Sequence, residues 1–113
     1  MHLTVIEQEG VSTVNVVGKL DIENGGTFKK RIRDVIGGGA KKILLDISGI
    51  TDVDSSGIGV LVALLNTARA GDGDLRLAGK FKQKVEDAFK LCGLDRVFIH
   101  YENVKDGIQQ FNS

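Results

Sequence analysis

The 113-residue sequence has no proline and no tryptophan, and it contains a single cysteine, Cys92. One cysteine excludes an intramolecular disulfide and is typical of a reducing compartment. No apolar run approaches the roughly 18 residues that a membrane-spanning helix needs, and the N-terminus has no signal-peptide pattern. These absences predict a cytoplasmic protein that inserts no segment into a membrane.

An excess of charge of either sign is also missing. Fifteen Lys and Arg residues balance fifteen Asp and Glu residues, so the formal net charge is zero. Proteins that bind nucleic acid usually present a basic face, and this balance therefore predicts no nucleic-acid partner. The apolar content of 42% is that of a folded chain. A chain of this length is expected to form one domain, residues 1–113, which buries roughly 65% of its unfolded surface.

Hydrophobic periodicity predicts the elements of the fold. Short apolar runs, rich in β-branched residues in the first two cases, predict five strands, at residues 3–7, 11–17, 43–47, 75–78 and 97–100. Apolar residues at helical spacing predict four helices, around residues 28–36, 55–70, 81–92 and 104–111. The first two strands should form an antiparallel hairpin about Gly10, and Gly18–Asp21 should then turn the chain. The remaining alternation predicts a layered α/β fold with a mixed, largely parallel five-stranded sheet.

The most informative stretch joins the third predicted strand to the second predicted helix. Ser55 and Ser56 stand at the N-terminus of this helix, where backbone N–H groups lack partners and the helix dipole favours an anion. Serine is a preferred N-cap, so we expect Ser55 at the cap. Gly57 and Gly59 each cost up to about 1 kcal/mol relative to alanine, so helix stability alone does not explain them. A phosphate on Ser55 would suit this helix end, and an ordinary serine cap in a tight loop is an equal alternative.

A helical wheel separates two faces of this helix. Its sheet-facing side is predicted to comprise Ile58, Leu61, Val62 and Leu65. A second stripe begins at Ser55 and is small and uncharged; this docking stripe consists of Gly59, Ala63, Asn66 and Ala70, with Val60 and Thr67 beside it. A helix face that meets only water would normally carry Lys, Glu or Arg. The docking stripe therefore predicts contact with another protein or cover by another segment of the same chain.

Catalytic and metal-binding motifs are incomplete. Residues 52–57 begin like a calcium loop, but its twelfth position needs a bidentate Glu and is Ala63. The Asp-x-Asp pair at 52–54 occurs in phosphatases with an aspartyl nucleophile, which need further acids and a Lys on a much larger scaffold. A nucleophilic serine would need His2 or His100 as its base, and both are distant in sequence. Cys92 ends an apolar helical pattern and is predicted to lie in the core. We therefore predict no metal, cofactor or catalytic residue, and a hydrolase using Ser55 or Asp54 is the enzymatic alternative.

Three motifs resemble one family. The run Asp54-Ser55-Ser56-Gly57-Ile58-Gly59 resembles the signature of bacterial anti-sigma factor antagonists, the single-domain STAS proteins. Gly18-Lys19-Leu20-Asp21 is similar to the family's Gly-Glu-Leu-Asp turn, with Lys19 in place of the acid. Leu91-Cys92-Gly93-Leu94 is similar to the end of the family's third helix, and the order of elements agrees over nearly the whole chain.

This resemblance implies a non-enzymatic partner switch. The unphosphorylated protein would bind an anti-sigma factor that is also a serine kinase, and this binding would release a sigma factor. The kinase, which supplies the ATP, would phosphorylate Ser55, and a PP2C-type phosphatase would restore the hydroxyl. Support of the phosphorylated loop would fall to Asp54, Ser56, Gly57 and Asp21. The free protein is expected to be a monomer.

Several points stay open at this level. Asp54 is a loop acid, a partner of the helix dipole, or an acceptor for the Ser55 hydroxyl. Asp21 lies beside the Ser55 loop according to the resemblance, and a turn residue that caps the first helix region is the alternative. Lys19 leaves the target open, so a scaffold or an accessory subunit in another signalling or lipid-transport complex is the alternative function.

Overall fold

A two-residue turn builds the first hairpin of the computed structural model, which describes all 113 residues. Glu9 and Gly10 have φ angles of 54° and 76°, the signature of a type I′ turn. They connect β1 (His2–Gln8) to β2 (Val11–Leu20) in an unbroken antiparallel register. The turn was expected to start at Gly18, which is wrong, because β2 continues through Gly18 to Leu20. Gly18, with a φ of 117°, accommodates a register shift against β3 there.

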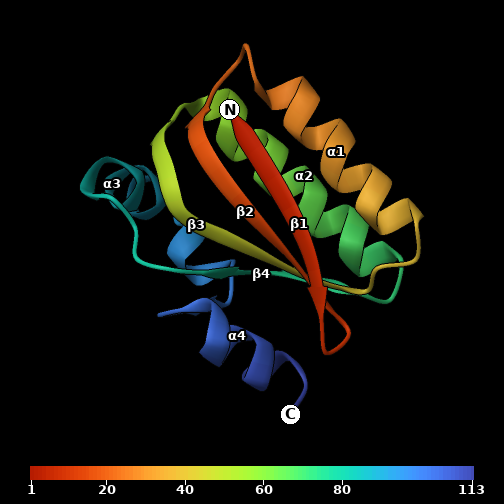
Figure 1. The fold of residues 1–113 in the computed structure, drawn as a ribbon. Coiled ribbons are helices and arrows are strands. Elements are labelled where there is room, and N and C mark those ends of the chain that lie inside the picture. Colours follow the sequence, from red (N-terminus) through yellow and green to blue (C-terminus); the bar gives the residue numbers. More distant parts are fainter.

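The remaining strands add in sequence order on the far side of β2. They are β3 (Lys42–Val53), β4 (Asp74–Ala78) and β5 (His100–Tyr101), and the sheet order is β1-β2-β3-β4-β5 (Figure 1). All neighbours from β2 to β5 are parallel, so the predicted mixed, largely parallel sheet is confirmed.

The last strand was predicted too early and too long, at residues 97–100. A 3₁₀ turn at Leu94–Arg96 precedes it, and the amides of Val97 and Phe98 donate to the carbonyl of Leu94. Amides engaged in this turn are not available to the strand ladder. Pairing therefore begins only at His100, which starts the edge strand that it was expected to end.

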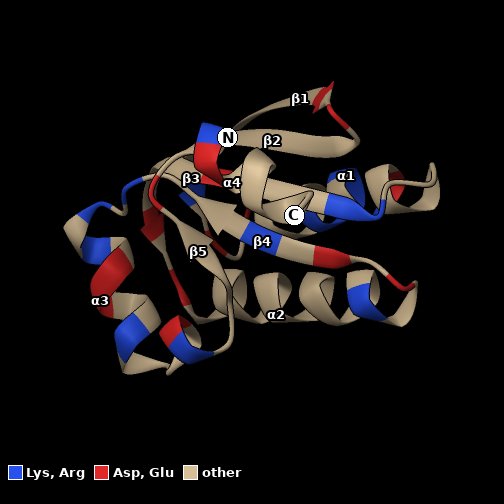
Figure 2. Ribbon diagram, turned by 90° about the horizontal axis from the view of Figure 1, so that it is seen from below, with Lys and Arg blue, Asp and Glu red and all other residues tan.

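Three helices cover one face of the sheet and one covers the other (Figures 1 and 2). The first face carries α1 (Gly25–Gly37), α2 (Ser55–Ala70) and α3 (Gln83–Leu91). On α2 the predicted core residues Leu61 and Leu65 are buried, whereas Ile58 and Val62 are only half-buried. The helix is rotated so that Leu64 enters the core in their place.

On the other face α4 (Val104–Phe111) packs against a smaller apolar cluster of Val11, Leu44, Ala78, Ile108 and Phe111. Gly107 lets α4 approach the sheet, since a Cβ there would lie 2.8 Å from Leu44 Cδ2. The guanidinium of Arg76 lies 4.1 Å from the centre of the Phe111 ring and donates to Asp74. Burial opposes ionisation of Asp74, but hydrogen bonds from Arg76 and Arg69 outweigh it, and the pKa of Asp74 is lowered.

Cys92 is exposed, so its predicted place in the core is wrong. The buried residues of α3 are Val85 and Phe89. The helix ends at Leu91, so Cys92 is its C-cap and does not continue the buried face. Gly93 then takes the left-handed conformation, with a φ of 71°, and redirects the chain. None of the helices is long and apolar enough to cross a lipid bilayer.

Candidate functional site

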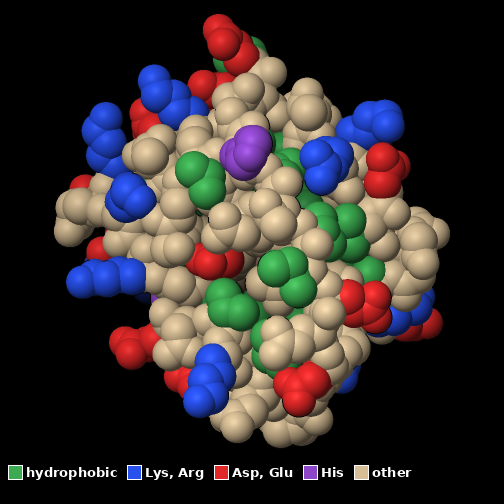
Figure 3. Space-filling view, viewed as in Figure 1, with side chains coloured by type: hydrophobic (Ala, Val, Ile, Leu, Met, Phe, Trp, Pro, Cys, Tyr) green, Lys and Arg blue, Asp and Glu red, His purple; other side chains and the backbone are tan.

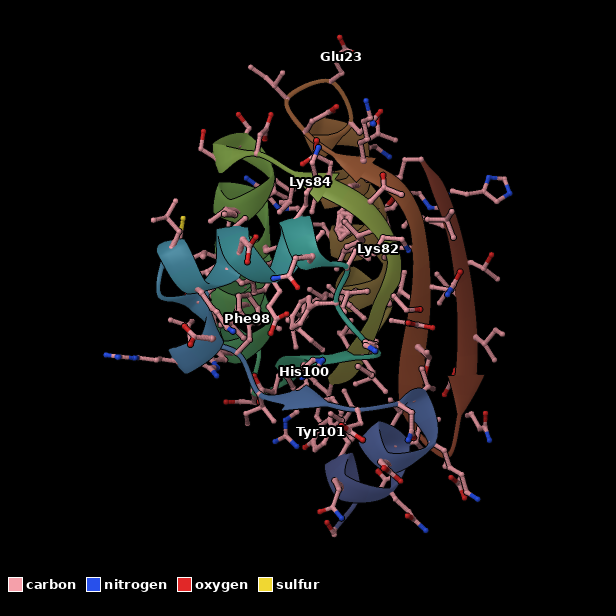
Figure 4. All side chains as sticks on the ribbon, turned by 90° about the vertical axis from the view of Figure 1, so that its left-hand side faces the viewer. Glu23, Lys82, Lys84, Phe98, His100 and Tyr101 are labelled. Carbon is pink, nitrogen blue, oxygen red and sulfur yellow. The ribbon has the colours of Figure 1, made fainter.

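The ends of two parallel strands meet at the start of α2. The amide of Asp54, directly after β3, donates to the carbonyl of Leu20 at the end of β2 over 3.3 Å. This bond places the loop from β2 to α1 beside the loop from β3 to α2. Figure 4 shows Glu23 at the tip of the first of these loops.

Asp54 joins these two loops through both of its carboxylate oxygens. Oδ1 accepts the amide hydrogen of Gly57 at 2.9 Å and caps α2, while Oδ2 accepts that of Ile22 at 3.1 Å. The expectation that Ser55 is the cap is therefore wrong: Ser55 is the first residue of the helix and Asp54 is the N-cap. An aspartate is as good a cap as a serine, and here the extended backbone of residue 54 places it in the capping position.

The capping geometry leaves Ser55 accessible. Its side chain is exposed and makes no hydrogen bond with Asp54, whereas Ser56 is half-buried. The amides of Ser55 and Ser56 have no partner within the chain, because the first-turn bonds involve Gly57 and Ile58. The helix start therefore presents one free hydroxyl and two free N–H donors to solvent.

Asp21 lies in the adjoining loop, as the resemblance implied, but its carboxylate serves its own turn. Oδ1 accepts the amide hydrogens of Glu23 and Asn24, each at 3.0 Å. The carbonyl of Asp21 also accepts from Gly25 at the start of α1. The structure thus supports the capping role for Asp21, next to the site and one residue from the Asp54 contact at Ile22.

The two glycines of the motif, Gly57 and Gly59, differ in how much space surrounds them. A Cβ on Gly57 would collide with the carbonyl oxygen of Leu20 and lie 2.9 Å from Val53 Cγ2. A Cβ on Gly59 would meet nothing within 4 Å. The fold therefore requires Gly57, so that α2 can start against β2, whereas no contact within the chain requires Gly59.

The docking stripe is open along most of its length. Gly59, Asn66 and Ala70 are exposed and Ala63 is half-buried, so no segment of the chain covers the stripe. Figure 2 shows α2 as a helix almost without charged residues, interrupted only near its C-terminal end, where Arg69 lies.

The two residues predicted beside the docking stripe are partly committed to the fold. Val60 faces α1, since a Cβ on Gly25 would lie 3.3 Å from Val60 Cγ2. The hydroxyl of Thr67 donates to the carbonyl of Ala63 over 2.9 Å. The open surface is therefore the docking stripe itself, and the side chains of Val60 and Thr67 contribute little to it.

Two features beside Ser55 were not found from the sequence. Ile22 is 75% exposed at the loop that Asp54 holds in place. Asp52 pairs with Lys19 in the β2–β3 register and lies 4.0 Å from Lys84 Nζ on α3 (Figure 4). The sequence predicts neither the exposure of Ile22 nor the position of Asp52, because both depend on how distant segments of the chain meet.

The histidines do not approach the Ser55 hydroxyl. His100 Nε2 lies 2.6 Å from the carbonyl oxygen of Gly79, and its ring stacks on Phe81. His2 belongs to β1, at the opposite edge of the sheet. No three His, Cys, Asp or Glu side chains gather to hold a metal ion. The surface hollows are lined by other residues than Ser55 or the docking stripe, so the site is an open surface and not a cleft.

The motif, the sheet order and this site agree with one family. The family model of the STAS domain matches residues 2–107, and the chain therefore belongs to the STAS domain family.

Among its relatives, a Thermotoga maritima protein that carries the name of an anti-sigma factor antagonist is 31% identical over 93 residues, which is 81% of each chain. A crystal structure of a Thermotoga maritima protein with the same designation superposes with a TM-score of 0.90 at 27% identity, covering 98% of this chain and 95% of that one. The phosphorylated form of the Bacillus cell-fate determinant SpoIIAA has a TM-score of 0.73 at 18% identity, covers 96% and 98% of the two chains, and shares the fold.

Proposed function

We propose that this STAS protein is an anti-sigma factor antagonist that is switched off by phosphorylation of Ser55. In the unphosphorylated form it binds an anti-sigma factor that is also a serine kinase, and this binding releases a sigma factor. The observation that carries the proposal is an exposed Ser55 at the head of an open, uncharged docking stripe. The names of the Thermotoga relatives support the same assignment.

The physical switch is local. Phosphorylation adds a charge of roughly −2 at the edge of the docking stripe. An unpaired charge buried against a partner costs several kcal/mol, and every 1.4 kcal/mol or so weakens binding about tenfold. In the free protein the N-terminus of α2 stabilises the phosphate by about 0.3–1 kcal/mol, and the free amides of Ser55 and Ser56 lie at this end. No rearrangement of the fold is needed.

The protein itself performs no chemistry in this mechanism. It presents the Ser55 hydroxyl, while the kinase binds ATP and transfers the phosphoryl group. A PP2C-type phosphatase then returns the hydroxyl. Asp54 holds the loop in the orientation that exposes Ser55, through its bonds to Gly57 and Ile22. Ser55 is the acceptor in preference to Ser56 because Ser55 is exposed and Ser56 is half-buried.

Mass spectrometry after incubation with ATP and a candidate anti-sigma kinase tests this function. We expect the intact protein to gain one phosphate and tandem spectra to place it on Ser55. Ser55→Ala should abolish the gain, while the matched variant Ser56→Ala should retain it. Phosphate found only on Ser56, or hydrolytic turnover without any partner, would contradict the proposal.

Lys19 favours a second candidate function. This residue replaces the acid of the family's turn and lies opposite Asp52 in the β2–β3 register, beside the site. A changed charge beside the site favours a different partner, and the second function is that of a scaffold or an accessory subunit in another signalling or lipid-transport complex. A stable complex whose affinity is the same with and without ATP would favour this second function.

A further inference from the structure

The two edges of the sheet are protected very differently. β5 has only two residues and lies beside α4, whereas β1 has seven residues and no element beyond it (Figure 4). β1 contains no lysine and no proline, and no bulge interrupts its register with β2. Natural proteins usually protect a long edge strand with a lysine, a proline or a β-bulge, and β1 has none of the three.

The side chains around this edge are apolar. Val5 and Ile6 of β1 are 40% and 58% exposed, and Val17 of the neighbouring strand is 46% exposed. Figure 3 looks onto this part of the molecule and shows apolar side chains near the centre of the view, with most charged side chains around its rim. The edge therefore combines free backbone groups with apolar side chains.

The hairpin turn determines which backbone groups are free. In a two-residue type I′ hairpin the residues that flank the turn, here Gln8 and Val11, form a hydrogen-bonded pair. Alternation along the unbroken register then directs the N–H and C=O groups of every second residue of β1 toward β2, starting from Gln8. The groups of Leu3, Val5 and Glu7 point away from the sheet.

We propose that β1 pairs with β1 of a second copy of this chain, antiparallel, about a two-fold axis at Val5. In this register Val5 lies opposite Val5 of the second copy and Leu3 lies opposite Glu7. All three outward-facing residues then exchange hydrogen bonds with outward-facing residues. A shift by two residues in either direction leaves the groups of Leu3 or of Glu7 without a partner in the opposite β1.

Charge favours the same register. Glu7 is the only Asp, Glu, Lys or Arg of β1. This register places each Glu7 opposite Leu3 of the other copy, so the two Glu7 carboxylates do not face each other. Leu3 and Arg31 of α1 line the same surface hollow, of about 120 Å³. The carboxylate of Glu7 from one copy therefore approaches the guanidinium of Arg31 in the other. The two-fold axis repeats this complementary contact.

The dimer is expected to be weak and compatible with partner binding. A single strand pair with its flanking side chains falls among the small, transient interfaces below about 1,200 Å². α1 packs beside β1, whereas α2 packs over β3 and β4, so the docking stripe of each copy stays free. The inference concerns the β1 edge of the sheet, whereas Ser55 follows β3 in the middle of the sheet, and it does not depend on the proposed function.

Sedimentation velocity of the full chain, from about 10 µM to about 1 mM, tests the dimer. We expect the mean mass to rise from 12.2 kDa toward twice that value as the concentration increases. A mass that remains at 12.2 kDa over the whole range would overturn the proposal.

Two sets of variants test the register. Val5→Pro removes the central outward N–H without removing a bond to β2, and proline is tolerated at such edge positions. Its far-ultraviolet circular dichroism should be unchanged and its mass monomeric at every concentration. Glu7→Arg and Arg31→Glu should each weaken the dimer by about tenfold, and the double variant should restore it to within about threefold of the natural sequence. A dimer that survives Val5→Pro, or a double variant no tighter than the single variants, would contradict this interface.

Discussion

Helices α1 and α2 lie side by side on the same face of the sheet, yet they are built differently. α1 has five charged residues among its 13, and the side chain of its N-cap residue, Asn24, makes no capping bond. α2 has one charged residue, Arg69, among its 16, and Asp54 caps it. Both bury apolar residues in the same core.

The comparison separates what the fold requires from what it does not. Packing on the sheet constrains only the inner face of each helix, and α1 shows that a charged outer face is compatible with this fold. The nearly uncharged outer face of α2, which carries only Arg69, therefore has another cause. Apolar and small residues grouped on an exposed surface are typical of protein interaction sites. The following variants test the roles assigned to α2, with α1 as the control where it offers a matched position.

The largest effect is expected on partner binding. Ala63→Arg places a long charged side chain in the docking stripe and should lower affinity for the anti-sigma partner by one to three factors of ten, about 1.4–4 kcal/mol. Arg33→Ala, on the exposed face of α1, is the control and should leave affinity unchanged. Titration calorimetry measures both.

Since Ala63 is half-buried, the thermal stability of each variant should be compared in parallel. Asn66→Arg, at a fully exposed position of the docking stripe, gives the same test without any packing change. Unchanged affinity in both stripe variants would place the binding surface elsewhere on the molecule.

The next effect is on the stability of the helix start. Gly57→Ala should destabilise the fold by roughly 1–3 kcal/mol or more, because its methyl group would strike the backbone of Leu20. Gly59→Ala, two residues further along α2, should instead stabilise it by up to about 1 kcal/mol. Urea unfolding measures both changes. Equal destabilisation by the two variants would contradict the different roles assigned to these glycines.

A smaller effect tests the two helix caps. Asp54→Ala removes the bond to the amide of Gly57 and the link to Ile22, and should cost about 1–2 kcal/mol. Asn24→Ala, at the start of α1, removes no capping bond and only the exposed hydrogen bond from the Asn24 amide to the carbonyl of Lys19, so it should cost less, about 0.5 kcal/mol. Thermal unfolding measures the loss of stability in both variants, and an equal loss would contradict the capping role of Asp54.

The smallest effect on stability is expected from Ser55→Asp. Ser55 is exposed in the first turn of α2, where an acid is favourable, so the melting temperature should change by less than the 4–8 °C that about 1 kcal/mol produces. The same variant should bind the partner weakly, as the phosphorylated form does. A large loss of stability would mean that Ser55 has a structural role, and unchanged binding would contradict the switch.

The sequence predicted the parts of this molecule that depend on local pattern. The hairpin at Gly10, the mixed sheet and the placement of Ser55 at the start of α2 are confirmed. The boundaries of β5 and the burial of Cys92 were wrong. In both places a turn near the end of α3 decides the course of the chain, and apolar residues before and after that turn look alike in sequence.

The sequence by itself determined the family and the presence of a serine at a helix N-terminus, because a motif and a hydrophobic period are local properties. Only the tertiary structure decided that Asp54 is the cap, that Gly57 is needed for contact with β2, and that the docking stripe is uncovered. It also decided which backbone groups of β1 point away from the sheet. These features depend on contacts between segments some thirty residues apart, such as Ile22 and Asp54, or on the absence of such contacts, and no local pattern encodes where distant segments meet.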